Sequence, residues 1–316
     1  MYAIDSMREI MRIIITGGAG FIGHHLALHL RDKGYEVLCI DNLSRASRSA
    51  LTLLKSHEIP LIKMDVQDYD NLVRILSDHD IIVHAAALID VEESLLKPLT
   101  YFENNALGTA TLVKACVDNN VHRIIYLSSA AVYGNPISLP IVETHPVDPI
   151  SPYGLSKAMG EEVIRLYSRI SDLDYVVLRL FNVYGPRQSH SSYAGVIARF
   201  AERIRAGRPP VIFGDGMQTR DFIHVRDVCI AIERALTTEH VNQVYNIGSG
   251  NPTRIIDLAK IMIKLSGLKL APIHIPPRQG DIRHSYADIT KAVKCLGFRP
   301  SIELEEGIRE LFQFSD

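Results

Sequence analysis

The stretch RIIITGGAGFIG, residues 12–23, decides the fold. A β-branched run, RIIIT, is followed by Gly17, Gly20 and Gly23 at three-residue spacing. Glycines at such a turn let the chain bend tightly between a strand and a helix and let the backbone approach a pyrophosphate at the helix N-terminus. The stretch therefore predicts the first strand, turn and helix of a dinucleotide-binding α/β fold, with Phe21 and Ile22 opening the helix.

Similar apolar runs alternate with helix-length amphipathic segments through the first 180 residues. They are YEVLCI (35–40), PLIKM (60–64), DIIVHA (80–85), RIIYLS (123–128) and YVVLRL (175–180). This alternation is typical of βαβ units and predicts a Rossmann-type, doubly wound parallel sheet.

After about residue 180 the alternation loosens, and Pro and Gly become frequent, as in AGRPP and IPPRQGD. This change indicates a smaller C-terminal α/β region with long loops. We therefore expect an NAD-binding domain over residues 11–180, with a return around 240–262, and a substrate domain over 181–316.

Composition argues against several classes of function. The chain has 34 basic and 36 acidic residues and a net charge of -2, which does not favour a nucleic-acid or polybasic membrane surface. No apolar run approaches the roughly 18 residues of a membrane span. The four cysteines are scattered singly, which favours reduced thiols in the cytoplasm and gives no metal-ligand spacing. We expect no metal, no nucleic acid and no membrane partner.

An acid follows the second predicted strand at the spacing of a ribose ligand. Asp41 lies 18 residues after Gly23, where its carboxylate can accept both ribose hydroxyls of a dinucleotide and would repel a 2′-phosphate. This favours NAD over NADP, although Arg45 and Arg48 follow in the next loop; the alternative for Asp41 is a loop cap. Asp65 and Val66 lie where they could contact adenine, and a helix N-cap is an equally good interpretation of Asp65.

The segment SPYGLSKAMGEE places two reactive side chains on one helix face. Ser151 and Pro152 mark the start of this helix, and Tyr153 and Lys157 are four residues apart. A lysine near the phenol favours the phenolate, so that Tyr153 can act as a base. The spacing alone occurs on many solvated helices, but the glycine turn, Asp41 and Ser129 favour a catalytic role.

Taken together, these motifs resemble the extended short-chain dehydrogenases/reductases of the nucleotide-sugar branch, and most closely the UDP-hexose 4-epimerases. The similarity runs from about Met11 to the C-terminus. It rests on TGGAGFIG, DNLS, HAAA, NNALGT, LSSAAVYG, YGLSK, RLFNVYGPRQ, FGDGMQTRDFIHVRD, YNIGSG and RQGDIRHSYAD, in that order.

The resemblance implies a bound NAD and roles for further residues. Ser129 would hold the sugar hydroxyl from which Tyr153 takes the proton, with a 4-keto sugar as the transient intermediate. Asn105 would stiffen the catalytic helix or reach the nicotinamide side. The remaining cofactor contacts implied are Asn42, Ser44, Ala85, Ala86, Ala87, Phe181 and Val183. His84 is better interpreted as a packed residue at a strand end than as a catalyst.

On the substrate side, two arginines lie on loops of a charge-balanced chain. Arg220 and Arg278 suit bidentate contact with phosphate oxygens, and the resemblance assigns both to the diphosphate of a UDP-sugar. It also implies substrate contacts from Asn182, Tyr193, Phe213 (on the uracil) and Asp281 (on the ribose). The alternatives are surface ion pairs for the arginines and a core position for Phe213.

One position bears on which sugars are accepted. Ser285 stands where many 4-epimerases carry a tyrosine that closes the pocket against an N-acetyl group. We therefore expect turnover of UDP-GlcNAc/UDP-GalNAc as well as UDP-Glc/UDP-Gal. The resemblance also implies a homodimer formed through the helices after Asn105 and Tyr153.

Three rival functions share the fold. Nucleotide-sugar 4,6-dehydratases and decarboxylases carry acids at the two positions after the hydroxyl residue, where this chain has Ala130 and Ala131. A 4-keto reductase would release oxidised cofactor in each cycle and would more often prefer NADP. A non-catalytic NAD-binding regulatory protein would usually have lost Tyr153 or Lys157.

Overall fold

The computed structural model describes residues 12–77, 80–188, 195–278 and 281–313. Its centre is a seven-stranded parallel sheet in the order β10-β6-β5-β4-β1-β2-β3. The strands are β1 (Arg12–Thr16), β2 (Glu36–Asp41), β3 (Leu61–Lys63), β4 (Asp80–His84), β5 (Arg123–Ser129), β6 (Asp174–Leu180) and β10 (Gln243–Ile247). The predicted doubly wound sheet is confirmed, and its order reverses between β1 and β4, where such sheets bind their ligands.

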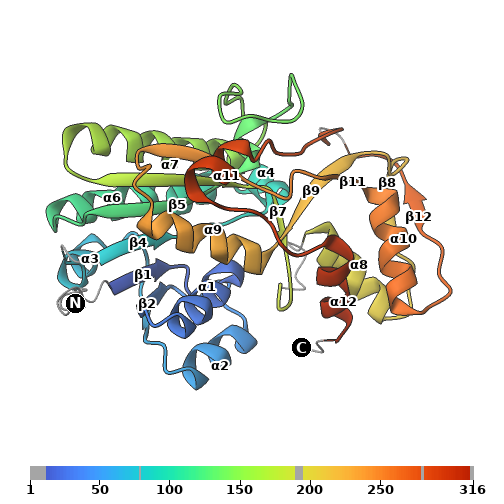
Figure 1. Ribbon diagram of the computed structural model, residues 1–316, viewed down its shortest axis with the longest axis horizontal. Coiled ribbons are helices and arrows are strands. Elements are labelled where there is room, and N and C mark those ends of the chain that lie inside the picture. The colour runs from blue at the N-terminus through green and yellow to red at the C-terminus, as the bar shows by residue number, and fades with distance from the viewer. Residues whose placement is uncertain (1–11, 78–79, 189–194, 279–280, 314–316) are drawn as a thin grey trace, which may run out of the picture.

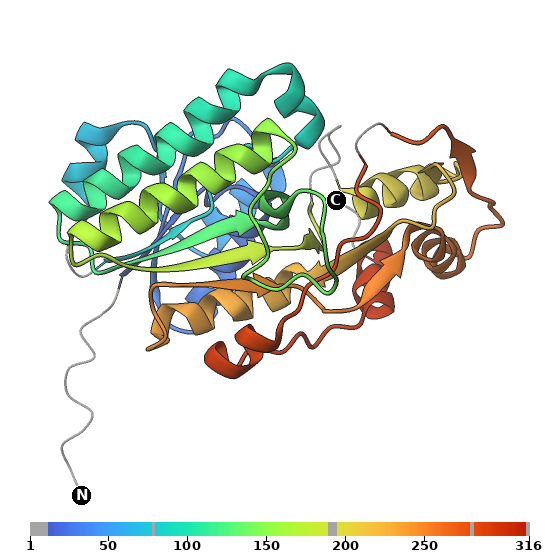
Figure 2. The ribbon, with the colours of Figure 1, turned by 90° about the horizontal axis from the view of Figure 1, so that it is seen from above.

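Helices cover both faces of this sheet because neighbouring residues of each strand point to opposite sides. Ile13 and Ile15 of β1 pack in a core with α1 (Phe21–Asp32) and α9 (Val225–Thr237), whereas Ile14 packs in the core on the other face. The first face also carries α2 (Arg48–Ser56) and α11 (Thr290–Leu296), and the second carries α3 (Tyr69–Ile75), α6 (Gly108–Asp118) and α7 (Pro152–Ile170). Figure 2 shows α6 and α7 running side by side over the second face.

Three short helical segments connect β4 to α6. They are α4 (Val91–Leu96), α5 (Pro98–Tyr101) and the π-helix η1 (Phe102–Leu107). A further 3₁₀ turn, η2 (Ala130–Tyr133), follows β5. Since π-helical turns are frequent at functional sites, η1 draws attention to the carboxyl end of β4.

A second region lies beside the carboxyl ends of the strands, on the right of Figure 1. It holds a three-stranded sheet, β11-β9-β7, and a parallel pair, β12-β8. The strands are β7 (Asn182–Tyr184), β8 (Val211–Phe213), β9 (Thr219–His224), β11 (Pro252–Arg254) and β12 (Ile273–Ile275). Its core is built by the helices α8 (Val196–Arg205), α10 (Ile255–Ser266) and α12 (Leu304–Gln313).

The return of the chain to the large sheet differs in part from the expected range of 240–262. Strand β10 does join the sheet beside β6, and α9, which precedes it, packs on that sheet. The helix that follows, α10, instead buries Leu258 and Met262 in the second core. The helix before the strand, rather than the one after it, therefore accompanies the return.

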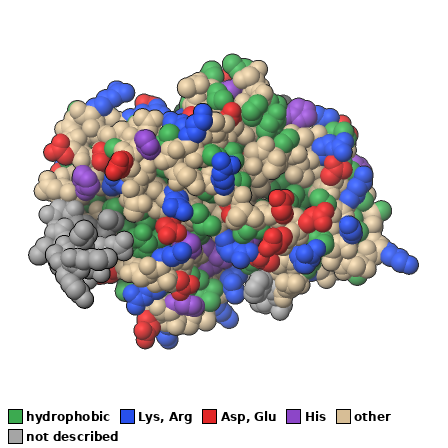
Figure 3. All heavy atoms as spheres, viewed as in Figure 1, with side chains coloured by type: hydrophobic (Ala, Val, Ile, Leu, Met, Phe, Trp, Pro, Cys, Tyr) green, Lys and Arg blue, Asp and Glu red, His purple; other side chains and the backbone are tan. Residues whose placement is uncertain are grey.

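Among the described residues, no helix is long and apolar enough to cross a membrane. On the face drawn in Figure 3, basic and acidic side chains are intermixed, as expected for a chain of net charge -2.

Candidate functional site

The glycine turn lies against the loop that follows β4. Gly17 has a φ of +69°, and a Cβ there would lie 2.7 Å from the backbone nitrogen of Ala86. The backbone of Gly17 therefore approaches the neighbouring loop more closely than a larger residue allows. A shallow space remains above the turn, of the kind that receives a pyrophosphate at the N-terminus of a helix.

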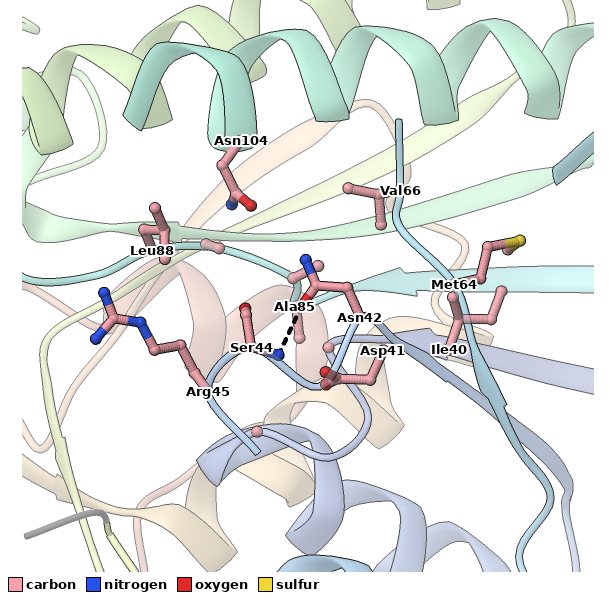
Figure 4. Close-up of a pocket in the computed structure, with 14 residues that line it drawn as sticks. Ile40, Asp41, Asn42, Ser44, Arg45, Met64, Val66, Ala85, Leu88 and Asn104 are labelled. Carbon is pink, nitrogen blue, oxygen red and sulfur yellow. Dashed lines mark hydrogen bonds between the residues drawn. The ribbon is translucent and has the colours of Figure 1, made fainter. Parts of the chain in front are cut away.

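A cavity of about 80 Å³ opens beside this turn. Figure 4 shows Val66 and Asn104 on one side of it and Asp41 and Arg45 on the other. The Asp41 carboxylate accepts the backbone N–H groups of Ala19 at 3.0 Å and Leu43 at 2.7 Å, which fix its direction. Burial raises the pKa of Asp41, and these two N–H groups oppose that shift. The carboxylate and the glycine turn both line this cavity, so an acceptor for hydroxyl groups lies next to the backbone of the turn.

Half of the residues predicted to bind the cofactor line this cavity. They are Gly17, Gly20, Asp41, Asn42, Ser44, Val66, Ala85, Ala86 and Ala87. The other predicted contacts lie outside its lining: Phe21, Ile22, Gly23, Asp65, Asn105, Tyr153, Lys157, Phe181 and Val183. The lining also includes five residues that the sequence analysis did not predict as cofactor contacts: Ile40, Arg45, Met64, Leu88 and Asn104. The signal for Ile40 and Met64 was their place next to Asp41 and Asp65 at strand ends.

Asp65 acts through its neighbour rather than on the cavity. Its carboxylate accepts the side-chain amide of Asn42 at 2.8 Å and the backbone N–H of Gln67 at 2.9 Å. The N-cap of α3 is Asp68, so the alternative interpretation of Asp65 as the helix N-cap is wrong. Asp65 instead holds Asn42 at the cavity wall.

Arg45, which weakened the preference for NAD at the sequence level, is engaged elsewhere. Its Nη2 lies 2.7 Å from Oε2 of Glu93, and the cations around Glu93 hold the pKa of that carboxyl down at about 2 despite its burial. The guanidinium is therefore turned to Glu93, while the ribose side of the cavity is faced by the Asp41 carboxylate.

The catalytic helix begins as predicted and buries both reactive groups. The Ser151 hydroxyl accepts the backbone N–H of Gly154 at 3.1 Å, and Pro152 opens the first turn of α7. Burial raises the pKa of the Tyr153 phenol, and a hydrogen bond with the Ser129 side chain opposes that shift. The structure thus places the side chains of Ser129 and Tyr153 close enough to interact.

Lys157 lies one turn further along α7. Burial lowers the pKa of its ammonium to about 7, while the Glu161 carboxylate acts in the opposite direction. Its Nζ lies 4.2 Å from the centre of the Tyr126 ring, which provides a favourable face for a cation. Near neutral pH this amine is therefore poised between its two protonation states.

Asn105 braces the catalytic helix from inside the protein. Its side chain pairs with both the N–H (2.8 Å) and the C=O (2.9 Å) of Leu88 and donates to the Ser156 hydroxyl at 2.9 Å. Adjacent residues of a helix point in different directions, so Asn104 reaches the cavity while Asn105 faces the interior. Through its bonds to Leu88 and Ser156, Asn105 connects the loop after β4 to α7.

His84 is a packed residue, buried to 1% exposure at the end of β4. Its Nδ1 lies 2.7 Å from the Thr16 hydroxyl and its Nε2 lies 2.9 Å from the Thr109 hydroxyl. Burial lowers its pKa to about 3, so the ring is neutral. His84 thus connects Thr16, just before the glycine turn, with Thr109 of α6, and it does not line the cavity beside the turn.

A second, larger cleft of about 520 Å³ lies between the loop after β4 and the second region. Asn182, Phe213, Arg220, Arg278 and Asp281 all line it, which brings five of the predicted substrate residues together. Arg220 pairs with Asp281 at 2.5 Å, and Arg278 pairs with Glu92 on α4. The sequence analysis missed Glu92, Arg199, Arg203 and Gln218 in this lining.

Of the other predicted substrate residues, Ser129 and Ser285 do not line this cleft. Ser285 is half-buried, and its backbone N–H donates to the carbonyl of Thr219 at 3.2 Å, next to Arg220 but outside the lining of the cleft. Tyr193 lies outside the described residues.

The two cavities share one wall. The loop after β4 supplies Ala85 to Leu88 to the first cavity and Ile89 to Glu92 to the second. A ligand in the first cavity and another in the second would therefore meet near this loop. Among the described residues, no group of three or more His, Cys, Asp or Glu side chains is placed to hold a metal ion.

Comparison with known proteins matches the model of a family described as the NAD dependent epimerase/dehydratase family over residues 13–248. A putative UDP-glucose 4-epimerase of Methanocaldococcus jannaschii is 39% identical over 301 residues, covering 95% of this chain and 96% of that protein.

Two solved structures are equally similar in fold. A UDP-glucose 4-epimerase of Thermotoga maritima with UDP-glucose has a TM-score of 0.91 at 36% identity, covering 96% of this chain and 98% of that chain. A UDP-N-acetylglucosamine 4-epimerase of Methanobrevibacter ruminantium in complex with UDP-N-acetylmuramic acid has a TM-score of 0.91 at 38% identity, covering 96% and 97%.

Proposed function

The chain belongs to the NAD dependent epimerase/dehydratase family, and from this membership and the geometry of its site we propose that it is a UDP-hexose 4-epimerase. It is an NAD-dependent isomerase that inverts carbon 4 of the sugar through a transient 4-keto intermediate. The observation that carries this function is the interaction of the Ser129 side chain with the buried phenol of Tyr153. Two alanines, Ala130 and Ala131, follow Ser129 directly in the sequence.

The proton chemistry belongs to three side chains. Ser129 holds the sugar hydroxyl, and Tyr153 takes its proton and returns it after the ketone has turned over. Burial by itself keeps the phenol protonated, so a neighbouring positive charge is needed to make it a base. Lys157 supplies part of that charge from the same helix face.

Bound NAD supplies a reversible hydride acceptor and, in its oxidised form, positive charge near the phenol. The residues we propose to hold it are those of the first cavity, with Asp41 at the ribose and the turn of Gly17 and Gly20 at the phosphates. Tyr153 and Lys157 would face its reactive end. We further propose that Phe181 and Val183 approach the nicotinamide and that Phe21, Ile22 and Gly23 shape the helix N-terminus.

The two residues after Ser129 favour epimerisation over elimination. Ala130 and Ala131 open the 3₁₀ turn η2, and the Ala131 backbone N–H donates to the Ser129 hydroxyl at 3.1 Å. Their methyl groups can neither give nor take a proton, so they cannot help to expel water or carbon dioxide from a keto sugar. Returning the hydride is the remaining fate of the intermediate.

The second cleft would hold the UDP moiety. Arg220 and Arg278 would bind the diphosphate, Phe213 would stack on uracil, and Asn182 and Asp281 would add hydrogen bonds. We propose this division between residues 11–180, with their return, for NAD and residues 181–316 for the nucleotide-sugar. Ser285, close to Arg220, supports our proposal that N-acetylhexosamines are also accepted, because its side chain is small.

A homodimer is supported by an apolar face on α7. Leu155, Met159, Leu166 and Ile170 lie on one side of the helix at 43%, 43%, 54% and 69% exposure. Helix α7 lies at the outside of the molecule in Figure 2, so a second copy could cover this face. All four cysteines are free thiols, which supports our proposal of a cytoplasmic location.

The test is turnover without added cofactor. Purified protein incubated with UDP-Glc, UDP-Gal, UDP-GlcNAc or UDP-GalNAc should yield the 4-epimer, with NAD recovered from the denatured protein. Tyr153→Phe is the matched control and should bind UDP while losing nearly all turnover. If no 4-epimer formed from any of the four sugars, the proposed function would be wrong.

A further inference from the structure

The two arginines of the second cleft that we assign to the diphosphate are already engaged by carboxylates of the protein itself. Arg220 donates to Asp281 at 2.5 Å, and Arg278 forms an ion pair with Glu92. Each carboxylate thus occupies a guanidinium that we assign to the diphosphate. A phosphate group that takes the same N–H donors must displace the carboxylate that now accepts them.

The Glu92 pair joins opposite walls of the cleft. Glu92 is the second residue of α4, on the wall built by the loop after β4, whereas Arg278 follows β12 in the second region. The Glu92 side chain is 60% exposed and that of Arg278 is 31% exposed. The Arg278 guanidinium carbon also lies 3.8 Å from the centre of the Phe213 ring. In this arrangement Arg278 contacts an anionic oxygen and a flat ring, and a uridine diphosphate likewise presents anionic oxygens and a flat ring.

We propose that Glu92 is a specificity-determining residue, which holds Arg278 until the negative charge of a diphosphate displaces it. This inference rests on the proposed function, because it assumes that the cleft binds UDP. A ligand with phosphates replaces the carboxylate with charge-assisted hydrogen bonds of its own. A neutral nucleoside offers no such replacement, so Glu92 makes the cleft select for phosphorylated ligands.

A second cation is available to Glu92 after displacement. Arg199 of α8 lines the same cleft, and its pKa is lowered by burial and by the charge of Arg278. Glu92 and Asp90 act on Arg199 in the opposite direction, so both carboxylates lie within electrostatic reach of it. When Arg278 turns to a phosphate, Glu92 remains near a positive charge, and the exchange leaves no acid without a compensating cation.

Glu92 gives a cleaner test than Asp281. Asp281 is proposed to contact the ribose, so its removal would alter two interactions at once. Glu92 has no assigned contact with substrate, and its exposed side chain makes Glu92→Gln compatible with folding. Exposed ion pairs contribute about 0.2–1 kcal/mol, which corresponds to a tightening of UDP binding of about 1.5- to 5-fold when the competing pair is removed.

The experiment is calorimetric titration of the wild type and Glu92→Gln with UDP and with uridine. UDP should bind the variant about 1.5- to 5-fold more tightly, and uridine should bind both proteins equally. The control is Asp118→Asn, which removes a carboxylate from the exposed Lys114 pair on α6, a helix that contributes no residue to the lining of the cleft. The control should leave UDP binding unchanged.

Three results would overturn the inference. Weaker UDP binding by Glu92→Gln would mean that Glu92 orients Arg278 for the phosphate, and unchanged binding would mean that it does not compete. An equal gain for uridine would show that charge is not what Glu92 selects. If the wild type itself failed to bind UDP, the proposed function would be wrong as well. The wild-type titration therefore distinguishes a failure of the proposed function from a failure of this inference alone.

Salt dependence gives an independent check. The gain of Glu92→Gln comes from removing one charge near another, so it should shrink when the titrations are repeated in about 1 M salt, where the screening length is roughly 3 Å. A gain of the same size at both salt concentrations would contradict a competition between charges.

Discussion

A buried ion pair beneath the catalytic residues offers a quantitative test of how the site is supported. The Glu161 carboxylate of α7 accepts Nε and Nη2 of Arg179 at 2.9 and 2.6 Å and the Ser128 hydroxyl at 2.6 Å. Both charged side chains are 2% exposed. Because Ser128 precedes Ser129, this cluster fixes the end of β5 against the catalytic helix.

Removing one partner should be strongly destabilising. Arg179→Met leaves Glu161 buried with only Ser128 and the more exposed Arg165 as partners, and a buried charge deprived of its partner costs about 3–5 kcal/mol. Replacing both, as in Glu161→Leu with Arg179→Met, removes the charges together. The Ser128 hydroxyl then loses its hydrogen-bond partner, which lowers the stability of the double variant by about 1–3 kcal/mol. The double variant should therefore be more stable than the Arg179→Met single variant.

The assay is urea unfolding at fixed protein concentration, analysed as a double-mutant cycle. Arg254→Met, which breaks an exposed pair with Asp257, is the control and should cost less than about 1 kcal/mol. The reasoning fails if Arg179→Met costs no more than this control, or if the double variant loses the sum of the two single losses.

Three further predictions concern the site. Gly17→Ala should lose bound NAD, measured in the denatured protein, because its Cβ would meet the Ala86 backbone. Gly207→Ala has a similar φ of +66° but open space around it and should retain NAD, so equal retention by both would contradict the close-approach argument. Lys157 has a pKa lowered to about 7, so the unfolded chain binds more protons between pH 7 and about 10.4, and NAD-free protein should gain stability as pH rises through that window. Lys157→Met should make the free energy of unfolding depend less on pH in this window. The same pH dependence in the wild type and the variant would contradict the prediction. Ser285→Tyr should suppress turnover of N-acetylhexosamines selectively, whereas an equal loss on UDP-Glc would count against a steric role.

The large sheet could be predicted because its signals are local. A β-branched run such as Ile13 to Ile15, buried on both faces, is followed within the same segment by the glycines of the turn. Each strand is recognisable from its own residues, and the parallel order follows from the helices between strands. The core in which α10 packs could not be predicted in this way, because an apolar stripe on a helix does not indicate which of two cores will bury it.

The predicted catalytic pair could also be proposed from the sequence, since Tyr153 and Lys157 lie four residues apart on one helix. The π-helical turn η1 has no such signal in the sequence, and of its two adjacent asparagines it is Asn104 that lines the first cavity. Asp65 was expected to contact adenine or to cap a helix, and neither expectation included its hydrogen bond with Asn42, 23 residues earlier in the chain. Contacts between side chains on separate loops leave no periodic signal.

The arginines of the second cleft show where such reasoning ends. From the sequence, Arg220 and Arg278 are two cations available for a diphosphate, because their loop positions say nothing about their partners. In the folded chain Arg278 meets Glu92, nearly two hundred residues earlier in the sequence, and Arg220 meets Asp281. The affinity of the cleft for a diphosphate therefore depends on one exchange at each arginine. In each exchange, the free energy gained by binding a phosphate is reduced by the free energy lost when the carboxylate leaves. The arginines counted in the sequence give the highest affinity that the cleft could have for an anion. The carboxylates that pair with them in the folded chain lower it.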